Sequence, residues 1–241
     1  METVVMLPSL AASGRTWRHQ VDALGGEFAV LTPELPGHAG DPGPFTLARA
    51  TAEVTDLLDR TPGPVHLVGL SLSATVAVLA CLARPGRLGS LVLSGGIAAP
   101  PPGLAVQRAV TTLLPEPVLA RGAARLLAPA LAERPEVERH RLLAEVTEDF
   151  RAAGRRTYLD ALRQLARADL RPRLGEVTAP TLVLCGSRDR VNLRGARELA
   201  AGIPDARLEI VPGVGHLWQL EQPELFSRTI AEFARENAAR P

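Results

Sequence analysis

Short hydrophobic runs and amphipathic stretches follow one another along this chain of 241 residues. Runs of branched apolar residues bounded by Gly or Pro predict buried strands, whereas apolar residues three and four positions apart predict helices that pack on a sheet. The predicted strands cover residues 3–7, 28–32, 65–70, 90–94, 181–185 and 207–211, and the helices between them 16–24, 46–58, 72–84, 194–201 and 223–238. Because strand and helix alternate, we predict an α/β fold, with a mostly parallel sheet of about six strands and helices on both faces.

The alternation is interrupted between residues 97 and 169, where no strand is predicted. Leu, Val and Ala recur on one side of each segment there, and Arg or Glu on the other, which is typical of amphipathic helices. The predicted helices of this region span residues 104–114, 118–127, 135–150 and 155–168. We therefore predict a helical cap of residues 97–169, inserted into a core domain made of residues 1–96 and 170–241.

Composition argues against several kinds of partner and site. Hydrophobic residues make up 46% of the chain and charged ones 22%, and the formal net charge of +1 argues against nucleic acid or an anionic membrane as a partner. No apolar run approaches the ~20 residues of a membrane-spanning helix, and the start lacks a signal-peptide pattern, so we expect a cytoplasmic protein. Cys81 and Cys185 lie inside apolar runs, which predicts no disulfide framework and no metal site.

A sharp turn is predicted where the third strand ends. Gly69, Ser71 and Ser73 form a Gly-x-Ser-x-small pattern, and a helix rich in Ala and Val follows. Such a strand–turn–helix forces its apical residue into a strained backbone and lifts that side chain clear of the sheet, so its neighbours two positions away must be small. Ser71 is therefore the candidate nucleophile, with Ser73 standing where a second Gly is more usual.

Two more chemically active side chains follow later strands. Asp189 comes after the strand 181–185, and His216 after the strand 207–211. Since the carboxyl ends of parallel strands share one crevice, we expect Ser71, Asp189 and His216 to meet there. A serine hydroxyl needs an imidazole to take its proton, and the imidazole needs a carboxylate to orient it. Asp205 and Glu221 are the rival acids.

On these motifs the chain resembles the α/β-hydrolase superfamily along essentially its whole length. The elbow around Ser71, the Gly-Ser-Arg-Asp stretch ending at Asp189 and the Gly-His-Leu-Trp stretch containing His216 fall where that family places them. The resemblance implies an α/β-hydrolase fold with a helical cap and a Ser71–His216–Asp189 triad. Because no antiparallel hairpin opens the chain, it is also similar to the shorter plant-type esterases and hydroxynitrile lyases.

The resemblance also implies an oxyanion hole made of two backbone N–H groups. Leu72, directly after the nucleophile, supplies one by its position. Most relatives carry His-Gly after the first strand, where this chain has Pro8 and Ser9, and proline has no N–H to donate. Leu10 is therefore the second candidate, with Ser9 as the alternative. The Pro-Ser-Leu stretch is similar to the Asn-Ser-Leu of β-ketoadipate enol-lactonases, which favours a lactone substrate.

The remaining histidines and both tryptophans are interpreted as structural. His38 follows a strand end, but the family commonly has Gly-His there as part of the loop. His19, His66 and His140 fall on helix or strand positions away from the crevice, and Trp17 and Trp218 are expected in the core or under the cap.

The first functional hypothesis is a serine-dependent carboxylic ester hydrolase that uses no metal or cofactor. With aromatic residues only 3% of the chain, we expect aliphatic side chains to line the pocket, so its partner would be a small ester or lactone with an apolar portion. The alternative is a lyase, dehydratase or cyclase that uses the same triad as acid and base. A ligand-binding protein with an intact triad is the third hypothesis.

Overall fold

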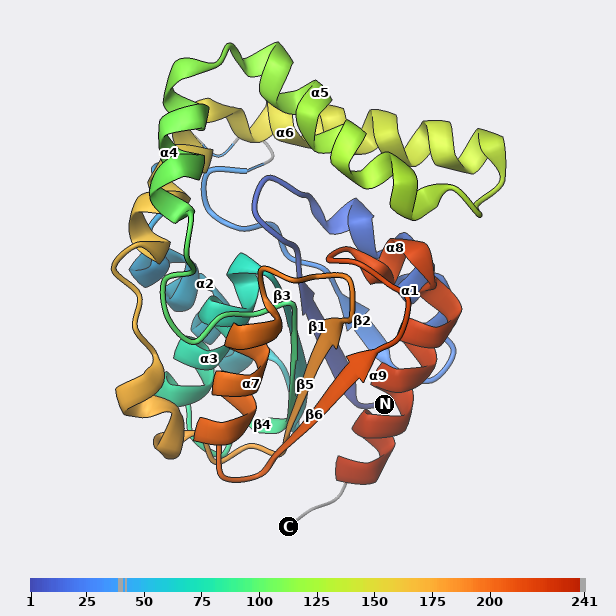
Figure 1. Cartoon of the computed structure of the whole chain (residues 1–241). Coiled ribbons are helices and arrows are strands. Elements are labelled where there is room, and N and C mark those ends of the chain that lie inside the picture. Colours follow the sequence, from blue (N-terminus) through green and yellow to red (C-terminus); the bar gives the residue numbers. More distant parts are fainter. Residues whose placement is uncertain (39–40, 42, 239–241) are drawn as a thin grey trace.

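A single parallel sheet forms the centre of the protein in the computed structural model, which describes residues 1–38, 41 and 43–238 (Figure 1). The strands of this described part are β1 Thr3–Leu7, β2 Ala29–Leu31, β3 Val65–Leu70, β4 Leu88–Ser94, β5 Thr181–Gly186 and β6 Ala206–Val211, in the order β2-β1-β3-β4-β5-β6. Leu70 pairs with Ser94, so β3 and β4 end level with each other, and β5, whose Leu184 pairs with Ser94, continues to Gly186. The predicted parallel sheet of about six strands is confirmed.

Helices cover both faces of this sheet, as predicted (Figure 1). The helices α2 Leu47–Arg60, α3 Leu72–Ala83 and α7 Leu193–Gly202 lie on one face, and α1 Arg18–Leu24 and α9 Pro223–Asn237 on the other. The Thr46 hydroxyl accepts a hydrogen bond from the Arg49 N–H at 3.1 Å and so caps α2. The predicted helix 16–24 instead begins as the 3-10 helix η1 Gly14–Trp17, and the short helix α8 Trp218–Glu221 was not predicted.

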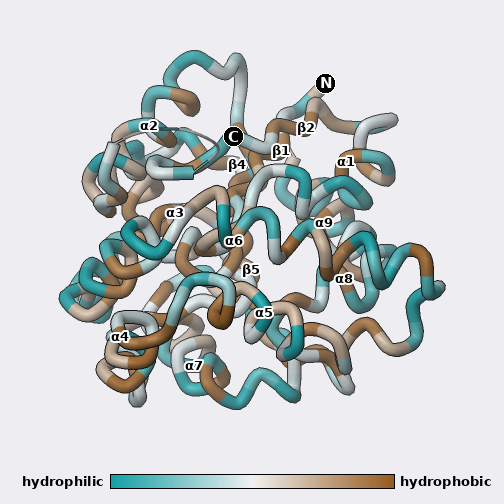
Figure 2. Tube along the Cα trace, turned by 90° about the horizontal axis from the view of Figure 1, so that it is seen from above, coloured by the Kyte–Doolittle hydropathy of each residue, from teal (hydrophilic) through white to brown (hydrophobic). Residues whose placement is uncertain are grey.

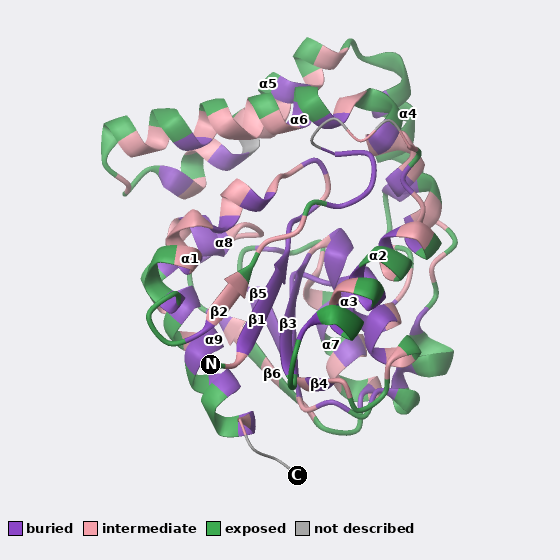
Figure 3. Cartoon of the chain, turned by 180° about the vertical axis from the view of Figure 1, so that it is seen from behind, coloured by how far each residue is buried: buried purple, intermediate pink, exposed green. Residues whose placement is uncertain are grey.

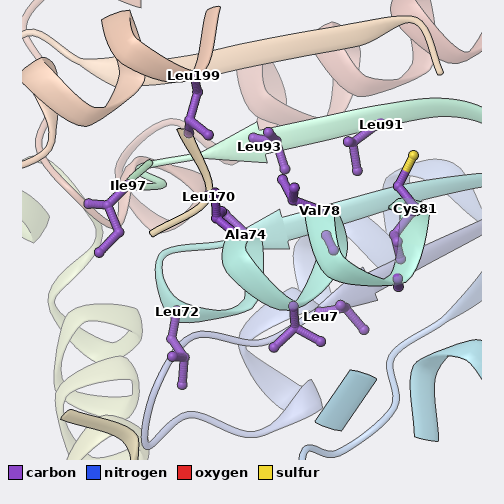
Figure 4. Close-up of a cluster of buried hydrophobic side chains, with 14 of the residues drawn as sticks. Leu7, Leu72, Ala74, Val78, Cys81, Leu91, Leu93, Ile97, Leu170 and Leu199 are labelled. Atoms are coloured by element: carbon purple, nitrogen blue, oxygen red, sulfur yellow. The ribbon is translucent and has the colours of Figure 1, made fainter. Parts of the chain in front are cut away.

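The two faces of the sheet pack into separate hydrophobic clusters. On one face, Ala74 and Val78 of α3 join Leu91 and Leu93 of β4 (Figure 4). On the other, Trp17 and Trp218 both contact Phe226 of α9, with ring centroids 5.6 Å and 4.6 Å apart. The inner strands are accordingly buried on both sides (Figure 3), and both tryptophans lie in the core.

The helices α4 Leu104–Leu113, α5 Glu116–Leu127 and α6 Glu136–Leu165 lie across the carboxyl edge of the sheet (Figures 1 and 2). The segments 135–150 and 155–168, predicted as two helices, are joined as α6, and Gly154 breaks the helix between them with φ 73° and ψ 159°. The 3-10 helices η2 Ala128–Leu131 and η3 Arg171–Glu176 connect α5 to α6 and α6 to β5. The α/β-hydrolase fold with a helical cap insertion is thus confirmed.

The boundaries at residues 96 and 169 stay predictions, and residues 239–241 of the last predicted segment lie outside the described part. No helix in the described ranges is both long and apolar enough to cross a membrane.

Candidate active site

The turn between β3 and α3 holds Ser71 in the strained conformation that the motif predicts. Its φ of 59° and ψ of −117° lie outside the regions that L-residues favour. Its N–H donates to the Ser94 carbonyl at 2.8 Å, which ties the turn to the end of β4. A Cβ on Gly69 would lie 2.6 Å from the Ser73 carbonyl oxygen, so only glycine fits there. The sheet and helix therefore fix the position of the Ser71 side chain.

Ser73 is fully buried, and its hydroxyl holds two strand ends together. The Oγ accepts a hydrogen bond from the Leu70 N–H at 2.8 Å. The hydroxyl hydrogen is shared between the Leu7 carbonyl oxygen, 2.9 Å from the Oγ, and the Leu70 carbonyl oxygen, 3.0 Å from it. The serine that replaces the more usual glycine thus joins the ends of β1 and β3 beside Ser71.

Removing this hydroxyl is expected to destabilise the protein. Ser73→Ala leaves the buried Leu70 N–H without its partner, so the free energy of unfolding should fall by about 1–3 kcal/mol in urea titrations. Ser187→Ala, which removes an exposed hydroxyl whose bond from the Gly213 N–H at 2.9 Å can be replaced by water, is the control and should change the value by less than about 0.5 kcal/mol. An unfolding midpoint for Ser73→Ala equal to that of the control would contradict this role.

The predicted acid and base are in direct contact. The Nδ1 of His216 lies 2.6 Å from Oδ2 of Asp189, so the Nδ1–H donates to the carboxylate. The Asn192 side-chain amide donates to both oxygens of Asp189 at 2.9 Å. Burial alone raises the pKa of the Asp189 carboxyl, but the bonds from His216 and Asn192 outweigh it and hold this pKa below its ordinary value. The carboxylate is therefore charged in the neutral pH range.

The imidazole reaches the same part of the sheet as the elbow. A Cβ on Gly95, which has a φ of 57°, would lie 2.9 Å from Nδ1 and Cε1 of His216. Gly95 directly follows Ser94, the residue whose carbonyl accepts the Ser71 N–H. Ser71 and His216 thus contact consecutive residues at the end of β4 and line one cavity. Among the described residues no hydrogen bond joins the two side chains; such contacts often tighten only when substrate binds.

The rival acids lie elsewhere. The Glu221 carboxylate accepts from the Gly215 N–H at 2.8 Å and pairs with Arg188 at 3.0 Å, so it supports the backbone of the loop that carries His216. Asp205 precedes β6, where its carbonyl accepts from the Thr181 N–H at the opposite end of the sheet.

The candidate oxyanion donors line the same cavity as Ser71. Leu72 is the first residue of α3, where N–H groups have no partner within the helix. Leu10 lies in the turn closed by the Ala12 N–H on the Ser9 carbonyl at 3.2 Å. His38 fixes this turn, because its Nε2 accepts from the Ala11 N–H at 3.0 Å while its Nδ1 donates to the Pro36 carbonyl. This buried histidine has the structural place predicted for it.

A cavity of ≈ 490 Å³ contains the predicted site residues and opens between the sheet and the cap. Its size suits a small organic molecule. Apolar side chains cover much of its wall, including Ile97, Leu104, Phe150, Leu162, Leu217 and Leu220. Across the described ranges, no group of three His, Cys, Asp or Glu side chains is placed to hold a metal ion.

Sequence reasoning missed two parts of the site. Asn192, three residues after Asp189, gives no signal of its own, because only the turn of the chain aims its amide at the carboxylate. Arg15 and Asp149 meet at the cavity wall although they are distant in sequence. His19, by contrast, pairs with Glu138, outside the cavity as expected.

Comparisons with known proteins show the family to which the chain belongs. Residues 4–229 match the alpha/beta hydrolase family. A 2-hydroxy-6-oxononadienedioate/2-hydroxy-6-oxononatrienedioate hydrolase of Cupriavidus pinatubonensis is 31% identical, over 96% of this chain and 86% of that relative. Among solved structures, a hydrolase from Pseudomonas aeruginosa is similar with a TM-score of 0.82 and 29% identity, covering 96% of this chain and 89% of its own. An enol-lactonase from Burkholderia xenovorans has a TM-score of 0.76 and 26% identity, covering 96% and 90%. The chain belongs to the alpha/beta hydrolase family.

Proposed function

We propose that this hydrolase cleaves a carboxylic ester or lactone through an acyl-enzyme on Ser71. The observation that carries the proposal is the 2.6 Å hydrogen bond between His216 and Asp189, in the cavity that Ser71 also lines. This pairing orients the imidazole with its Nε2 available for the serine proton, which is the arrangement a hydroxyl nucleophile requires.

The reaction begins when the Ser71 Oγ attacks the substrate carbonyl while the Nε2 of His216 takes the hydroxyl proton. The imidazolium that forms is stabilised by the Asp189 carboxylate and then donates its proton to the departing alcohol oxygen. In a lactone this oxygen stays attached to the acyl chain. Water, deprotonated by His216, next attacks the acyl-enzyme, and the bond to the Ser71 Oγ then breaks as the His216 imidazolium returns the proton to this oxygen and the acid is released.

Negative charge develops on the carbonyl oxygen in each half of the reaction. We assign its stabilisation to the N–H groups of Leu72 and Leu10, with Ser9 as the alternative for the second donor. Leu72 also lies at the positive end of the α3 dipole, which favours an anion there. Because the backbone positions these donors before substrate binds, they need no reorganisation during the reaction.

The apolar wall of the cavity supports a substrate with an apolar portion. The similarity to an enol-lactonase and the Pro8-Ser9-Leu10 stretch support a lactone among the candidates. None of the proposed steps requires a metal ion or an organic cofactor.

A panel of 4-nitrophenyl esters and small lactones tests the proposal. Turnover should begin with a burst of nitrophenol equal to the enzyme concentration, and a phosphonate should label Ser71 covalently, as mass spectrometry of the peptide would show. If the panel gives no hydrolysis but the protein catalyses an elimination or a ring closure, the acid–base alternative replaces this proposal. Tight ligand binding without any turnover would favour the binding protein.

Asn192 is proposed to position the acid. Asn192→Leu keeps the size of the side chain but removes its hydrogen bonds to both oxygens of Asp189. The orientation of this carboxylate toward the Nδ1 of His216 should therefore be less well fixed. We expect kcat to fall about tenfold with little change in KM. A purely structural effect would instead lower the fraction of folded enzyme, which active-site titration with the phosphonate measures separately.

A further inference from the structure

The wall of the cavity contains a charged contact between the cap and the loop after β1. The Nη2 of Arg15, in η1, lies 2.6 Å from Oδ1 of Asp149 in α6. The Ser13 N–H and hydroxyl both donate to Oδ2 of Asp149 at 3.0 Å. We call Ser13, Arg15, Glu145 and Asp149 the cap–core clasp, since Glu145 lies one turn earlier on α6 and its carbonyl accepts from Arg15 at 3.0 Å.

The positive charge of Arg15 is already neutralised within the protein. Besides Asp149, its guanidinium contacts the Glu148 carboxylate at 3.1 Å. The Glu145 carboxylate, in turn, pairs with Arg18 at 3.0 Å. The side chain of Asp149 is only 10% exposed, so moving Arg15 away would leave a largely buried carboxylate without its cation.

In the described ranges, the charged side chains that line the cavity away from Asp189 and His216 offer one cation against two carboxylates, and all three are already paired within the protein. Apart from the Asp189–His216 pair, the charged side chains among its described lining residues are Arg15, Glu145 and Asp149. An anionic group entering from solvent would find Arg15 already bound to Asp149 and Glu148, so no cation among the described lining residues away from His216 is free to pair with it. A carboxylate buried without a cation loses its hydration without compensation, whereas an uncharged chain meets the apolar wall without this penalty.

We propose that the cap–core clasp makes the cavity select uncharged substrates and reject anionic ones of the same shape. This inference rests on the proposed ester or lactone hydrolysis. It adds that the substrate is uncharged and that residues of the cap–core clasp determine this preference. Asp149 and Glu145 act here by holding the guanidinium groups of Arg15 and Arg18, which are then unavailable to an anion, and by adding negative charge at the wall.

Two esters of equal shape test the selection. The 4-nitrophenyl ester of 6-methylheptanoic acid and the mono-4-nitrophenyl ester of adipic acid share a leaving group and differ by an isopropyl group in place of a carboxylate. We expect kcat/KM to favour the neutral ester by about 30-fold or more. A preference below about threefold, or one for the adipate ester, overturns the proposal.

Variants locate the selection in the clasp. Asp149→Asn and Glu145→Gln each remove one negative charge at the wall and should reduce the preference about five- to tenfold. Glu138→Gln is the matched control, because Glu138 also joins α6 to the core, through His19, but does not line the cavity. Its preference should stay within about twofold of the wild type. If all three variants change both esters equally, the clasp only holds the cap in place and the proposal is wrong.

A binding measurement distinguishes the proposed charge selection from the proposed hydrolysis. On the Ser71→Ala protein, 6-methylheptanamide should bind about 30-fold more tightly than adipic acid monoamide in calorimetric titrations. Equal affinities reject the charge selection, whatever the enzyme hydrolyses. If the wild type turns over neither ester while the amide is still preferred, the hydrolase proposal fails and the charge selection stands.

Discussion

Ser71→Ala is expected to lower kcat for ester or lactone hydrolysis by about 10⁴-fold or more. Alanine keeps the Cβ and the strained backbone of the turn but has no oxygen to attack the carbonyl, so the acyl-enzyme cannot form. The His216–Asp189 pair and the oxyanion donors remain and should give only residual activity. Initial rates together with the burst amplitude measure the loss, and phosphonate labelling should disappear with it.

Stability and a second serine serve as controls for this variant. The thermal unfolding midpoint of Ser71→Ala should lie within about 3 °C of the wild type, because no hydrogen bond of the Ser71 side chain caps α3. Ser187→Ala, directly after β5, should retain activity within about threefold. Turnover by Ser71→Ala above about a tenth of the wild-type rate would show that the reaction does not pass through Ser71.

Asp189→Asn is expected to reduce kcat by about 10³- to 10⁴-fold while the protein stays folded. The amide carries no charge to stabilise the imidazolium, and it can present an N–H to His216 in place of an acceptor, which selects the wrong tautomer. Because the pKa of the Asp189 carboxyl lies below its ordinary value, the wild-type group is ionised throughout the neutral range. The loss should therefore persist across that range in pH profiles.

Glu221→Gln gives the matched comparison for the acid. Its amide oxygen can still accept from the Gly215 N–H, so the loop bearing His216 keeps its support and kcat should fall less than about tenfold. If Glu221→Gln lost as much activity as Asp189→Asn, Glu221 would have to be counted in the triad.

Particular elements show why some boundaries were predicted and others were not. The inner strands were placed to within two residues, because runs buried on both faces carry a strong signal. The edge strand β2 is shorter than the predicted 28–32, since it pairs only with β1 through Ala29–Leu31. The helix α6 is interrupted at Gly154, whose backbone is not helical, so the predicted segments 135–150 and 155–168 correspond to the two parts of this helix.

The site was predictable where its residues follow strand ends and unpredictable where the cap meets the core. Ser71, Asp189 and His216 could be found because the edge of a parallel sheet gathers the loops after its strands. The contact between Ser13 and Asp149 joins residues 136 positions apart, and no local pattern in either segment predicts it.

Hydrophobic periodicity and local backbone requirements were enough to predict the order of strands and helices along the chain, the sharp turn at Ser71 and the three chemical groups that follow strand ends. The folded arrangement was needed to show that Asp189 rather than Glu221 contacts His216 and that Asn192 supports that acid. It also decided that Arg15 is held by Asp149 at the cavity wall. These outcomes depend on side chains from distant segments meeting at hydrogen-bonding distance, which packing of the cap and loops on the sheet fixes and local sequence does not encode.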